Sequence, residues 1–331
     1  MGQSKLVILG TGGTIAGRAD SQSQGVGYKA GQITVQSLLD AIPDLEQQAL
    51  GPVQTQQIAQ VDSKDMDWPV WRALLHACVQ ALEDADTRAV VITHGTDTLE
   101  ETAWLLHSLL PATKPIVLTC AMRPATALLA DGPQNLRDAV TVAASGGRSG
   151  VWVVAGGEVH AAAQVQKVHP YRLQAMRSVE GGPQALVEEG RVRWLVPHAP
   201  SSPSAPAPSA RAVVPASMSS DLLALDELPW VEVVFSGALA RASGVDALVA
   251  AGVRGIVVAG TGNATVHEGM EAALQRARDK GVWIWRGTRC AEGLPVASGL
   301  GANPAEADLA QLPVAKARIA MMLALAAQPR D

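Results

Sequence analysis

Cysteine, basic residues and long apolar runs are scarce in this chain, and each shortage excludes a class of protein. Three scattered cysteines, with no CxxC pair among them, argue against a disulfide framework and against a structural zinc site. With a formal net charge of -5, the chain offers no basic stripe for nucleic acid. We therefore expect neither a nucleic-acid partner nor a bound metal.

The apolar residues are never gathered into a membrane-spanning run. No stretch approaches the roughly 20 apolar residues that a membrane helix requires. Lys5 is followed by a short β-like run, which differs from the long apolar region of a secretory signal. The sequence thus predicts a cytoplasmic protein without a membrane partner, or a periplasmic one if a signal has been removed.

What the chain does contain is an alternation of strand and helix patterns. Its 331 residues exceed what one core usually holds, so two domains are expected. Strands are expected at residues 5–9, 53–61, 89–93, 115–120 and 150–155, and helices at 34–42, 65–85, 98–110 and 135–144. This order is typical of right-handed βαβ units in a mostly parallel sheet. The fold class is therefore α/β.

A change of composition divides the chain. Residues 197–215, PHAPSSPSAPAPSARAVVP, alternate proline with serine and alanine, a pattern that suits an exposed linker. Strands are then expected at 231–235, 255–259 and 282–285, and helices at 245–251, 267–280 and 316–327. The predicted domains are a larger N-terminal α/β domain (1–196), the linker (197–215) and a smaller C-terminal α/β domain (216–331). Residues 301–310 are expected to form an extra loop without an assigned role.

The first motif is the turn TGGTIAG at residues 11–17, directly after the first strand. Three interpretations compete: a dinucleotide-binding turn, a plain tight turn, and a turn that presents Thr11 and Thr14 at the carboxyl end of a strand. The dinucleotide fingerprint requires a small residue where Ile15 stands, so this interpretation is weak. A polar, glycine-rich loop at 18–27 follows instead of a helix.

The second motif, HGTDTLEET at residues 94–102, also lies where a strand meets a helix. Backbone N–H groups at a helix N-terminus can bind an anion or an oxyanion. Thr98 and Glu101 fit a capping box, which is ordinary helix chemistry. Capping does not explain Thr96 and Asp97, an adjacent hydroxyl and carboxylate ahead of the cap.

Together these two segments resemble the signature segments of the bacterial-type L-asparaginases, the asparaginase/glutaminase family, and most closely its type II subgroup. Shorter family-like segments occur in order at 61–66, 121–124, 130–136, 260–263 and 316–318, so the resemblance covers nearly the whole chain. It implies an amidohydrolase without a cofactor that hydrolyses L-asparagine, with L-glutamine as a lesser substrate. The alternatives are a broader glutaminase-asparaginase, or a non-catalytic amino-acid-binding or amidotransferase-associated relative. A nucleotide-binding oxidoreductase comes last.

The resemblance also implies roles for individual residues. Thr14 is expected to be the nucleophile that forms an acyl-enzyme, with Tyr28 beside it to orient the hydroxyl and take part in proton transfer. Thr96, Asp97 and Lys167 are expected to form a second triad. The stretch before Lys167 reads AAAQ at 161–164, where the family commonly has Asp-Gly-Arg.

Substrate recognition follows from the charges of asparagine. Asp97 is the natural partner of the α-ammonium group. The remaining substrate-binding residues are expected to be Ser63, Lys64, Gly95, Thr96 and Ala121, of which Ser63, Gly95 and Thr96 suit the α-carboxylate. Lys64 is a departure, because many relatives have glutamine there.

The family plan further implies a homo-oligomer, a tetramer built as a dimer of dimers. Thr265 of a neighbouring subunit is expected to complete each site. Glu292 is a candidate for a second contribution, although an exposed turn carboxylate explains it slightly better. His94 is interpreted as a packed, hydrogen-bonded histidine rather than a general base.

Overall fold

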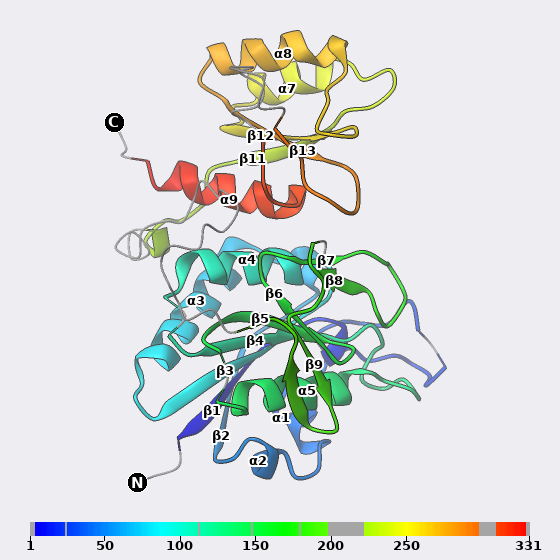
Figure 1. Cartoon of the computed structure of the whole chain (residues 1–331), viewed down its shortest axis with the longest axis vertical. Coiled ribbons are helices and arrows are strands. Elements are labelled where there is room, and N and C mark those ends of the chain that lie inside the picture. Colours follow the sequence, from blue (N-terminus) through cyan, green and yellow to red (C-terminus); the bar gives the residue numbers. More distant parts are fainter. Residues whose placement is uncertain are drawn as a thin grey trace. The chain divides into compact units, whose positions relative to one another are not determined.

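The computed structural model describes residues 4–23, 25–111, 113–146, 148–178, 180–197, 222–297 and 309–328. The chain divides into two compact units, Met1–Pro200 and Ser201–Asp331, and each is described by itself (Figure 1). Most of the predicted linker at 197–215 and most of the loop at 301–310 lie outside the described residues.

The described part of the first unit is built on an eight-stranded sheet with the order β10-β9-β6-β5-β4-β3-β1-β2. Its parallel strands are β1 (Lys5–Gly12), β2 (Val53–Val61), β3 (Thr87–Thr93), β4 (Pro115–Thr119) and β5 (Gly150–Ala155). The antiparallel strands are β6 (Glu158–Ala161), β9 (Ala185–Glu188) and β10 (Arg191–Trp194). A separate two-stranded ribbon pairs β7 (Val165–Lys167) with β8 (Met176–Ser178).

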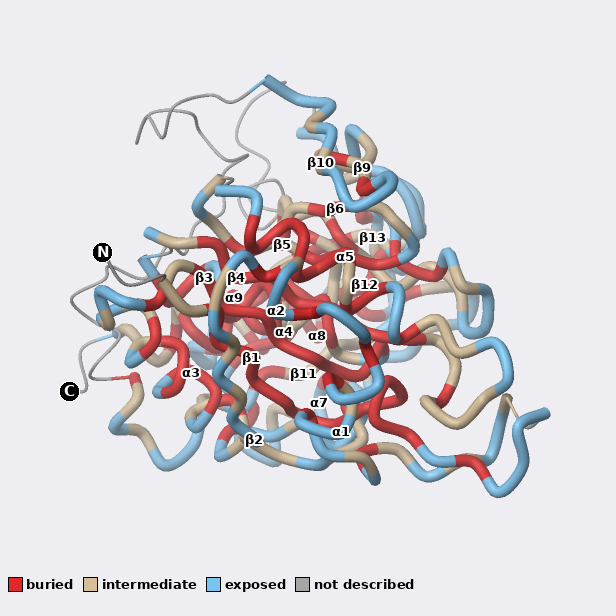
Figure 2. Tube along the Cα trace, turned by 90° about the horizontal axis from the view of Figure 1, so that it is seen from below, coloured by how far each residue is buried: buried red, intermediate tan, exposed pale blue. Residues whose placement is uncertain are grey.

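Helices cover both faces of this sheet, which is why its central strands are continuous apolar runs. On one face Leu6, Ile8, Val91 and Val117 join a core cluster with α1 (Val35–Asp40), α2 (Leu45–Gln48) and α5 (Gly132–Ala144). The opposite face carries α3 (Trp68–Glu83) and α4 (Leu99–Leu109) (Figure 1). Strands β1, β3 and β4 are buried over nearly their whole length (Figure 2).

Local signals explain where these helices begin and end. The Thr34 hydroxyl accepts a hydrogen bond from Ser37 N at the start of α1, and the Asp67 carboxylate accepts one from Val70 N at the start of α3. Pro69 stands in the first turn of α3, where its missing N–H costs nothing. The nine strands and helices predicted for this unit are confirmed, with ends that differ by at most three residues. The short strands β6 to β10 and helix α2 were not predicted.

The second unit has a parallel sheet with the order β11-β12-β13. Its strands are β11 (Val231–Phe235), β12 (Gly255–Gly260) and β13 (Trp283–Thr288), and its helices are α7 (Ser243–Ala250), α8 (Glu268–Asp279) and α9 (Val314–Ala326). Ile256 and Val258 pack with Val245 of α7 and Leu274 of α8 in one core cluster. All six predicted elements of this unit are confirmed.

Among the described residues, no helix is both long enough and apolar enough to cross a membrane.

Candidate active site

The two predicted motifs meet at one edge of the sheet because β1 and β3 are neighbouring parallel strands. Gly10 pairs with Thr93, so the segments that follow both strands leave the same edge. Gly13, with φ of 79°, approaches the second motif so closely that a Cβ on it would lie 2.2 Å from the Gly95 Cα. A Cβ on Gly95 would in turn lie 2.4 Å from Ser63 Oγ. Because these two glycines have no side chain, the loops that contain Gly13, Ser63 and Gly95 can pack directly against one another.

Of the two threonines in the first motif, Thr14 forms a hydrogen bond with another side chain and Thr11 forms one with the backbone. Thr11 belongs to β1, is buried, and donates its hydroxyl to Thr93 O over 3.0 Å. Thr14 opens a short 3-10 turn, Thr14–Ala16, and its hydroxyl oxygen lies 2.6 Å from the Tyr28 hydroxyl. Of the competing interpretations, the one in which the turn presents a hydroxyl is thus supported for Thr14 and wrong for Thr11.

Burial raises the pKa of the Tyr28 phenol, and the carboxylates of Asp62, Asp97 and Asp131 raise it further. The hydrogen bond with Thr14 acts in the opposite direction. An ordinary tyrosine pKa is about 10, so the phenol retains its proton near neutral pH.

The loop that carries Tyr28 is fastened at its base. Arg18 and Lys29 exchange two backbone hydrogen bonds, and Ala19 N donates to Thr126 Oγ1 over 2.9 Å. Because Tyr28 directly precedes Lys29, its backbone belongs to this fastened base.

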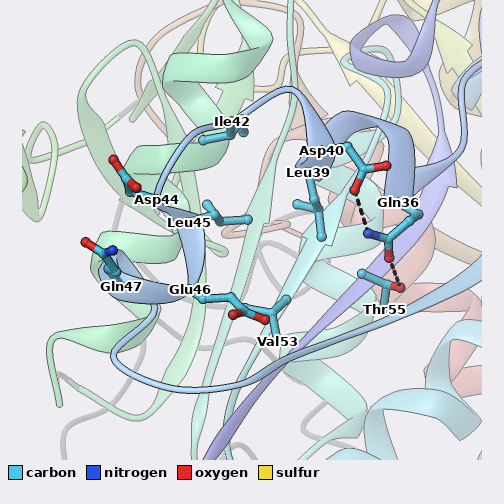
Figure 3. Close-up of a pocket in the computed structure, with 10 residues that line it drawn as sticks. All are labelled: Gln36, Leu39, Asp40, Ile42, Asp44, Leu45, Glu46, Gln47, Val53 and Thr55. Carbon is cyan, nitrogen blue, oxygen red and sulfur yellow. Dashed lines mark hydrogen bonds between the residues drawn. The ribbon is translucent and has the colours of Figure 1, made fainter.

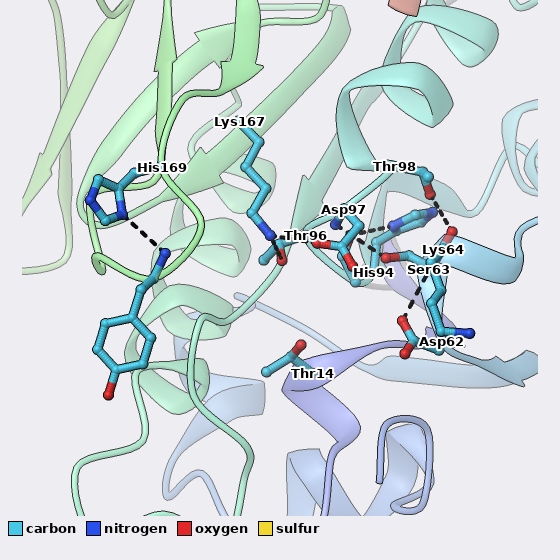
Figure 4. Close-up of polar contacts among 12 residues, drawn as sticks. Thr14, Asp62, Ser63, Lys64, His94, Thr96, Asp97, Thr98, Lys167 and His169 are labelled. Carbon is cyan, nitrogen blue, oxygen red and sulfur yellow. Dashed lines mark hydrogen bonds and ion pairs between the residues drawn. The ribbon is translucent and has the colours of Figure 1, made fainter. Parts of the chain in front are cut away.

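Lys167 joins the second motif from the end of β7. Its Nζ donates to Thr96 Oγ1 over 2.8 Å and to Asp97 Oδ1 over 2.5 Å (Figure 4). Thr96 is 4% exposed, whereas the Asp97 side chain is 51% exposed, so one member of the triad is enclosed and another faces solvent. The structure therefore brings together the three residues of the predicted triad, although Lys167 lies 71 positions from Thr96 and 70 from Asp97 in the chain.

Ser63 links the second motif to β2. Its hydroxyl accepts Asp97 N over 3.2 Å, and its carbonyl accepts the Thr98 hydroxyl over 2.7 Å. Thr98 precedes α4, but its side chain makes no capping hydrogen bond to the helix. The predicted capping box of Thr98 and Glu101 is therefore wrong: the Thr98 hydroxyl is turned toward the Ser63 carbonyl, to which it donates, and it accepts no N–H of the helix.

The other predicted substrate residues lie around this group. Lys64 follows Ser63 and forms an ion pair with Asp65. Ala121 is fully buried two residues beyond the end of β4. Just beyond it the Asp131 carboxylate accepts Met122 N and Arg123 N, each over 2.9 Å. Asp131 lies in a segment that was noted only as family-like, and its part in holding this loop was not predicted.

The two residues predicted to serve a neighbouring subunit belong to the second unit. Thr265 closes a turn after β12, in which its hydroxyl lies 2.8 Å from the Thr261 hydroxyl and donates to Thr261 O. Asn263, in the same turn, is held to Val296 by two hydrogen bonds. Glu292 lies in an exposed bend.

His94 is fully buried, as predicted, and burial lowers its pKa to about 4. Its ring nitrogens contact Gly95 O at 2.7 Å and Thr102 Oγ1 at 2.9 Å. Trp71 Nε1 donates to the same Thr102 hydroxyl over 2.8 Å. Sequence analysis did not single out Thr102 or Trp71, and the only available signal was the position of Thr102 inside the second motif.

A separate cavity of about 410 Å³ lies among α1, α2 and β2 (Figure 3). It is lined by apolar side chains such as Leu39, Leu45 and Val53 and by the carboxylates Asp40, Asp44 and Glu46. None of its lining residues belongs to the predicted site. Within the described ranges, no group of three or more His, Cys, Asp or Glu side chains is arranged to hold a metal ion.

The chain matches two family models that together cover most of its length. Residues 5–199 match the family model "Asparaginase, N-terminal", and residues 230–331 match "Glutaminase/Asparaginase C-terminal domain". The chain is 34% identical to a probable periplasmic L-asparaginase of Haemophilus influenzae, over 97% of this chain and 88% of that protein. It is also 34% identical to a glutaminase-asparaginase of Pseudomonas fluorescens biotype A, over 86% of this chain and 75% of that protein.

A solved structure is similar as well. The crystal structure of a probable cytoplasmic L-asparaginase from Campylobacter jejuni matches with a TM-score of 0.85 and 32% identity, covering 97% of this chain and 95% of that one. Two consecutive family domains and relatives of this similarity over nearly the whole chain place the protein in the asparaginase family.

Proposed function

We propose that this chain hydrolyses L-asparagine to L-aspartate and ammonia. One observation carries the proposal: two buried threonine hydroxyls lie beyond the ends of neighbouring strands of one sheet, and each contacts a polar side chain. Thr14 contacts Tyr28, and Thr96 contacts Lys167. A threonine hydroxyl attacks an amide only when a neighbouring group activates it. The similarity to L-asparaginases supports the same reaction.

In the proposed first step, Thr14 Oγ1 forms a bond to the side-chain carboxamide carbon of asparagine. Because the Tyr28 phenol keeps its own proton, it can accept the Thr14 proton only while donating its own. That proton goes to the substrate nitrogen, the C–N bond breaks and ammonia leaves. Thr14 then carries a β-aspartyl ester.

In the second step, water attacks the ester carbon, the bond from that carbon to Thr14 Oγ1 breaks, aspartate is released and one water proton returns to Thr14. Thr96, Asp97 and Lys167 are proposed to hold this water and the leaving ammonia. An ammonium group is a hydrogen-bond donor only, so Lys167 leaves the Thr96 proton available for a second partner.

Recognition of the substrate is proposed to use opposite charges. The half-exposed Asp97 carboxylate suits the α-ammonium group. The Ser63 hydroxyl accepts Asp97 N and so keeps its own proton for the α-carboxylate, together with the backbone at Gly95 and Thr96. Lys64 is proposed to lie at the rim of the substrate site, where its pairing with Asp65 offsets its charge, and Ala121 to contribute apolar contact.

A broader glutaminase-asparaginase is the second candidate, because one of the similar proteins bears that name. A single methylene distinguishes the two substrates, which corresponds to about 1–3 kcal/mol in a pocket. The test is ammonia release by the purified chain from L-asparagine and L-glutamine, each at several concentrations. Ammonia from neither amide would refute the proposed function, and comparable kcat/KM for both would favour the second candidate.

We also propose a cytoplasmic homotetramer, built as a dimer of dimers, in which Thr265 and Glu292 of one subunit complete the site of its neighbour. The compartment requires a direct test, since similar proteins are named both periplasmic and cytoplasmic. Fractionation of the source cells, with detection of the protein by antibody, provides it. For the domains we propose 1–196 and 216–331 joined by a linker at 197–215, so that limited proteolysis cuts first within 197–215.

A further inference from the structure

A buried chain of three hydrogen bonds runs from α3 to the peptide between Gly95 and Thr96. Trp71 Nε1 contacts Thr102 Oγ1 at 2.8 Å, Thr102 Oγ1 contacts His94 Nε2 at 2.9 Å, and His94 Nδ1 contacts Gly95 O at 2.7 Å. Thr102 and His94 are 0% exposed and Trp71 is 7% exposed. The proposed reaction assigns no step to any of these three side chains.

Burial lowers the pKa of His94 to about 4, so its ring is neutral near pH 7, and with a neutral ring only one direction of donation fits these three hydrogen bonds. An indole nitrogen can only donate and a carbonyl oxygen can only accept. His94 Nδ1 therefore carries the proton that is donated to Gly95 O, and Trp71 Nε1–H is donated to the Thr102 oxygen. The Thr102 proton is then directed to His94 Nε2, which accepts it. This assignment requires a neutral imidazole in the Nδ1–H tautomer.

The last of these three hydrogen bonds, from His94 to Gly95 O, fixes the orientation of the Thr96 N–H at the candidate site. A peptide unit is planar and trans, so its C=O and N–H point in opposite directions. Holding Gly95 C=O against His94 therefore turns the Thr96 N–H away from His94. The same Thr96 is held through its side chain by Lys167 (Figure 4).

The anchoring points come from three elements, which makes the peptide hard to rotate. Trp71 belongs to α3, Thr102 to α4 and His94 to the end of β3, where His94 N also donates to Thr119 O of β4. The neighbouring Gly95 cannot relax freely, since Gly13 and Ser63 pack directly against it.

We infer that Trp71, Thr102 and His94 are positioning residues that hold the Gly95–Thr96 peptide so that the Thr96 N–H faces the oxygen of the reacting amide. That the Thr96 N–H faces a substrate amide oxygen rests on the proposed function. The direction of the three hydrogen bonds rests on the residues themselves. A donor fixed in advance stabilises the oxyanion as it forms, without reorganisation during the reaction.

The first test compares kcat for L-asparagine, the dissociation constant of L-aspartate and the melting temperature. Thr102→Val preserves shape but breaks two of the three bonds, whereas Thr102→Ser keeps the hydroxyl. His94→Leu removes the donor to Gly95 O, whereas the side-chain N–H of His94→Asn can replace it. We expect Thr102→Val and His94→Leu to lower kcat by about tenfold or more. The dissociation constant of L-aspartate should stay within roughly threefold of the value for the unaltered protein. Thr102→Ser and His94→Asn should keep most of the original kcat.

Thr141→Val is the matched control. The Thr141 hydroxyl, on α5, is also buried, donates to Arg137 O and accepts Gln48 Nε2, so its loss likewise breaks two hydrogen bonds of a buried hydroxyl but has no link to Gly95. The inference predicts unchanged kcat in this variant. It is overturned if Thr102→Val keeps kcat within a factor of two, if Thr141→Val loses as much, or if Thr102→Ser fails to restore activity.

A second test does not depend on activity. In protein labelled with 15N-histidine, the His94 resonances should report the Nδ1–H tautomer between pH 6 and 8, and Thr102→Val should perturb them. An Nε2–H tautomer in the unaltered protein would overturn the inference even if asparagine is hydrolysed. The Nδ1–H tautomer without ammonia from either amide would instead refute the proposed function and leave the hydrogen-bond chain in place.

Discussion

The hydroxyl oxygens of Thr14 and Tyr28 lie 2.6 Å apart, at the base of a loop that backbone hydrogen bonds fasten on both sides of Tyr28. Two hydroxyls at this distance form a hydrogen bond of ordinary length, in which either one can be the donor. The phenol, whose pKa is raised by burial, therefore faces the hydroxyl proposed as the nucleophile while still protonated.

Removal of the Thr14 hydroxyl should abolish turnover without unfolding the protein. Thr14→Ala leaves the turn intact, because the turn depends on Gly12 and Gly13, both at positive φ. Thr14→Ser should retain part of the activity because it keeps the hydroxyl. Ammonia release and the melting temperature measure the two effects, and an alanine variant near the wild-type rate would show that the nucleophile lies elsewhere.

Tyr28→Phe should lower kcat by roughly 100-fold or more, the usual contribution of a proton-transferring side chain. The chain supplies its own control, since it has only one other tyrosine, Tyr171, which is exposed. Tyr171→Phe should leave kcat unchanged. Equal losses in the two variants would contradict a special role for the Thr14–Tyr28 contact.

Lys167→Met should also reduce kcat/KM strongly, because Thr96 and Asp97 would both lose the ammonium group that joins them. Lys64→Met is the comparison, since Lys64 pairs with Asp65 at the surface and its side chain is 60% exposed. Initial rates over a range of asparagine concentrations separate the two. A Lys64 variant that is the more damaged of the two would argue against the proposed triad.

The stability of the protein should fall below neutral pH because of His94. Its pKa is about 4 in the folded state, below the ordinary value near 6.5, so the unfolded chain binds the proton first as the pH decreases. The stabilising effect is complete above pH 6.5 and is lost as the pH falls toward 4. Between pH 7 and pH 5 this group alone should remove roughly 2 kcal/mol from the free energy of unfolding.

Urea unfolding at fixed protein concentration, followed by tryptophan fluorescence at both pH values, measures this loss. His94→Asn should show a smaller difference between pH 7 and pH 5 than the unaltered protein. His76→Asn, at an exposed position, should keep the full difference. If both variants keep it, another group is responsible for the acid sensitivity.

The sequence predicted the parts of the fold that depend on local patterns. Residues 53–61, for example, form β2 over that same range, and Pro69 stands in the first turn of α3. Strands β6 to β10 escaped prediction because they have only three or four residues each, too few for a period to appear.

Contacts between side chains that are far apart in the sequence could not be predicted, for a different reason. Thr98 has an ordinary capping sequence, yet its hydroxyl goes to Ser63, 35 positions away. Trp71 and Thr102 are 31 positions apart and look like core residues of two helices. The resemblance to a family supplied Lys167, which no pattern in the residues around it singles out. Tertiary structure decides such pairings, and spacing in the sequence does not encode them.

The last prediction concerns assembly. If Thr265 of one subunit completes the site of another, two inactive variants should restore each other when their subunits exchange. One carries Thr14→Ala; the other carries Asn263→Ala and Thr265→Ala, which dismantle the turn that Asn263 fastens to Val296. A mixed dimer then contains one site with both Thr14 and Thr265, so equal amounts after random exchange should give roughly a quarter of wild-type activity.

The control is a mixture of Thr14→Ala with Tyr28→Phe, which cannot complement because both residues belong to the first unit and contact each other within one chain. Failure of the first pair after verified subunit exchange, or full activity from a species that sediments as a monomer, would contradict the shared site.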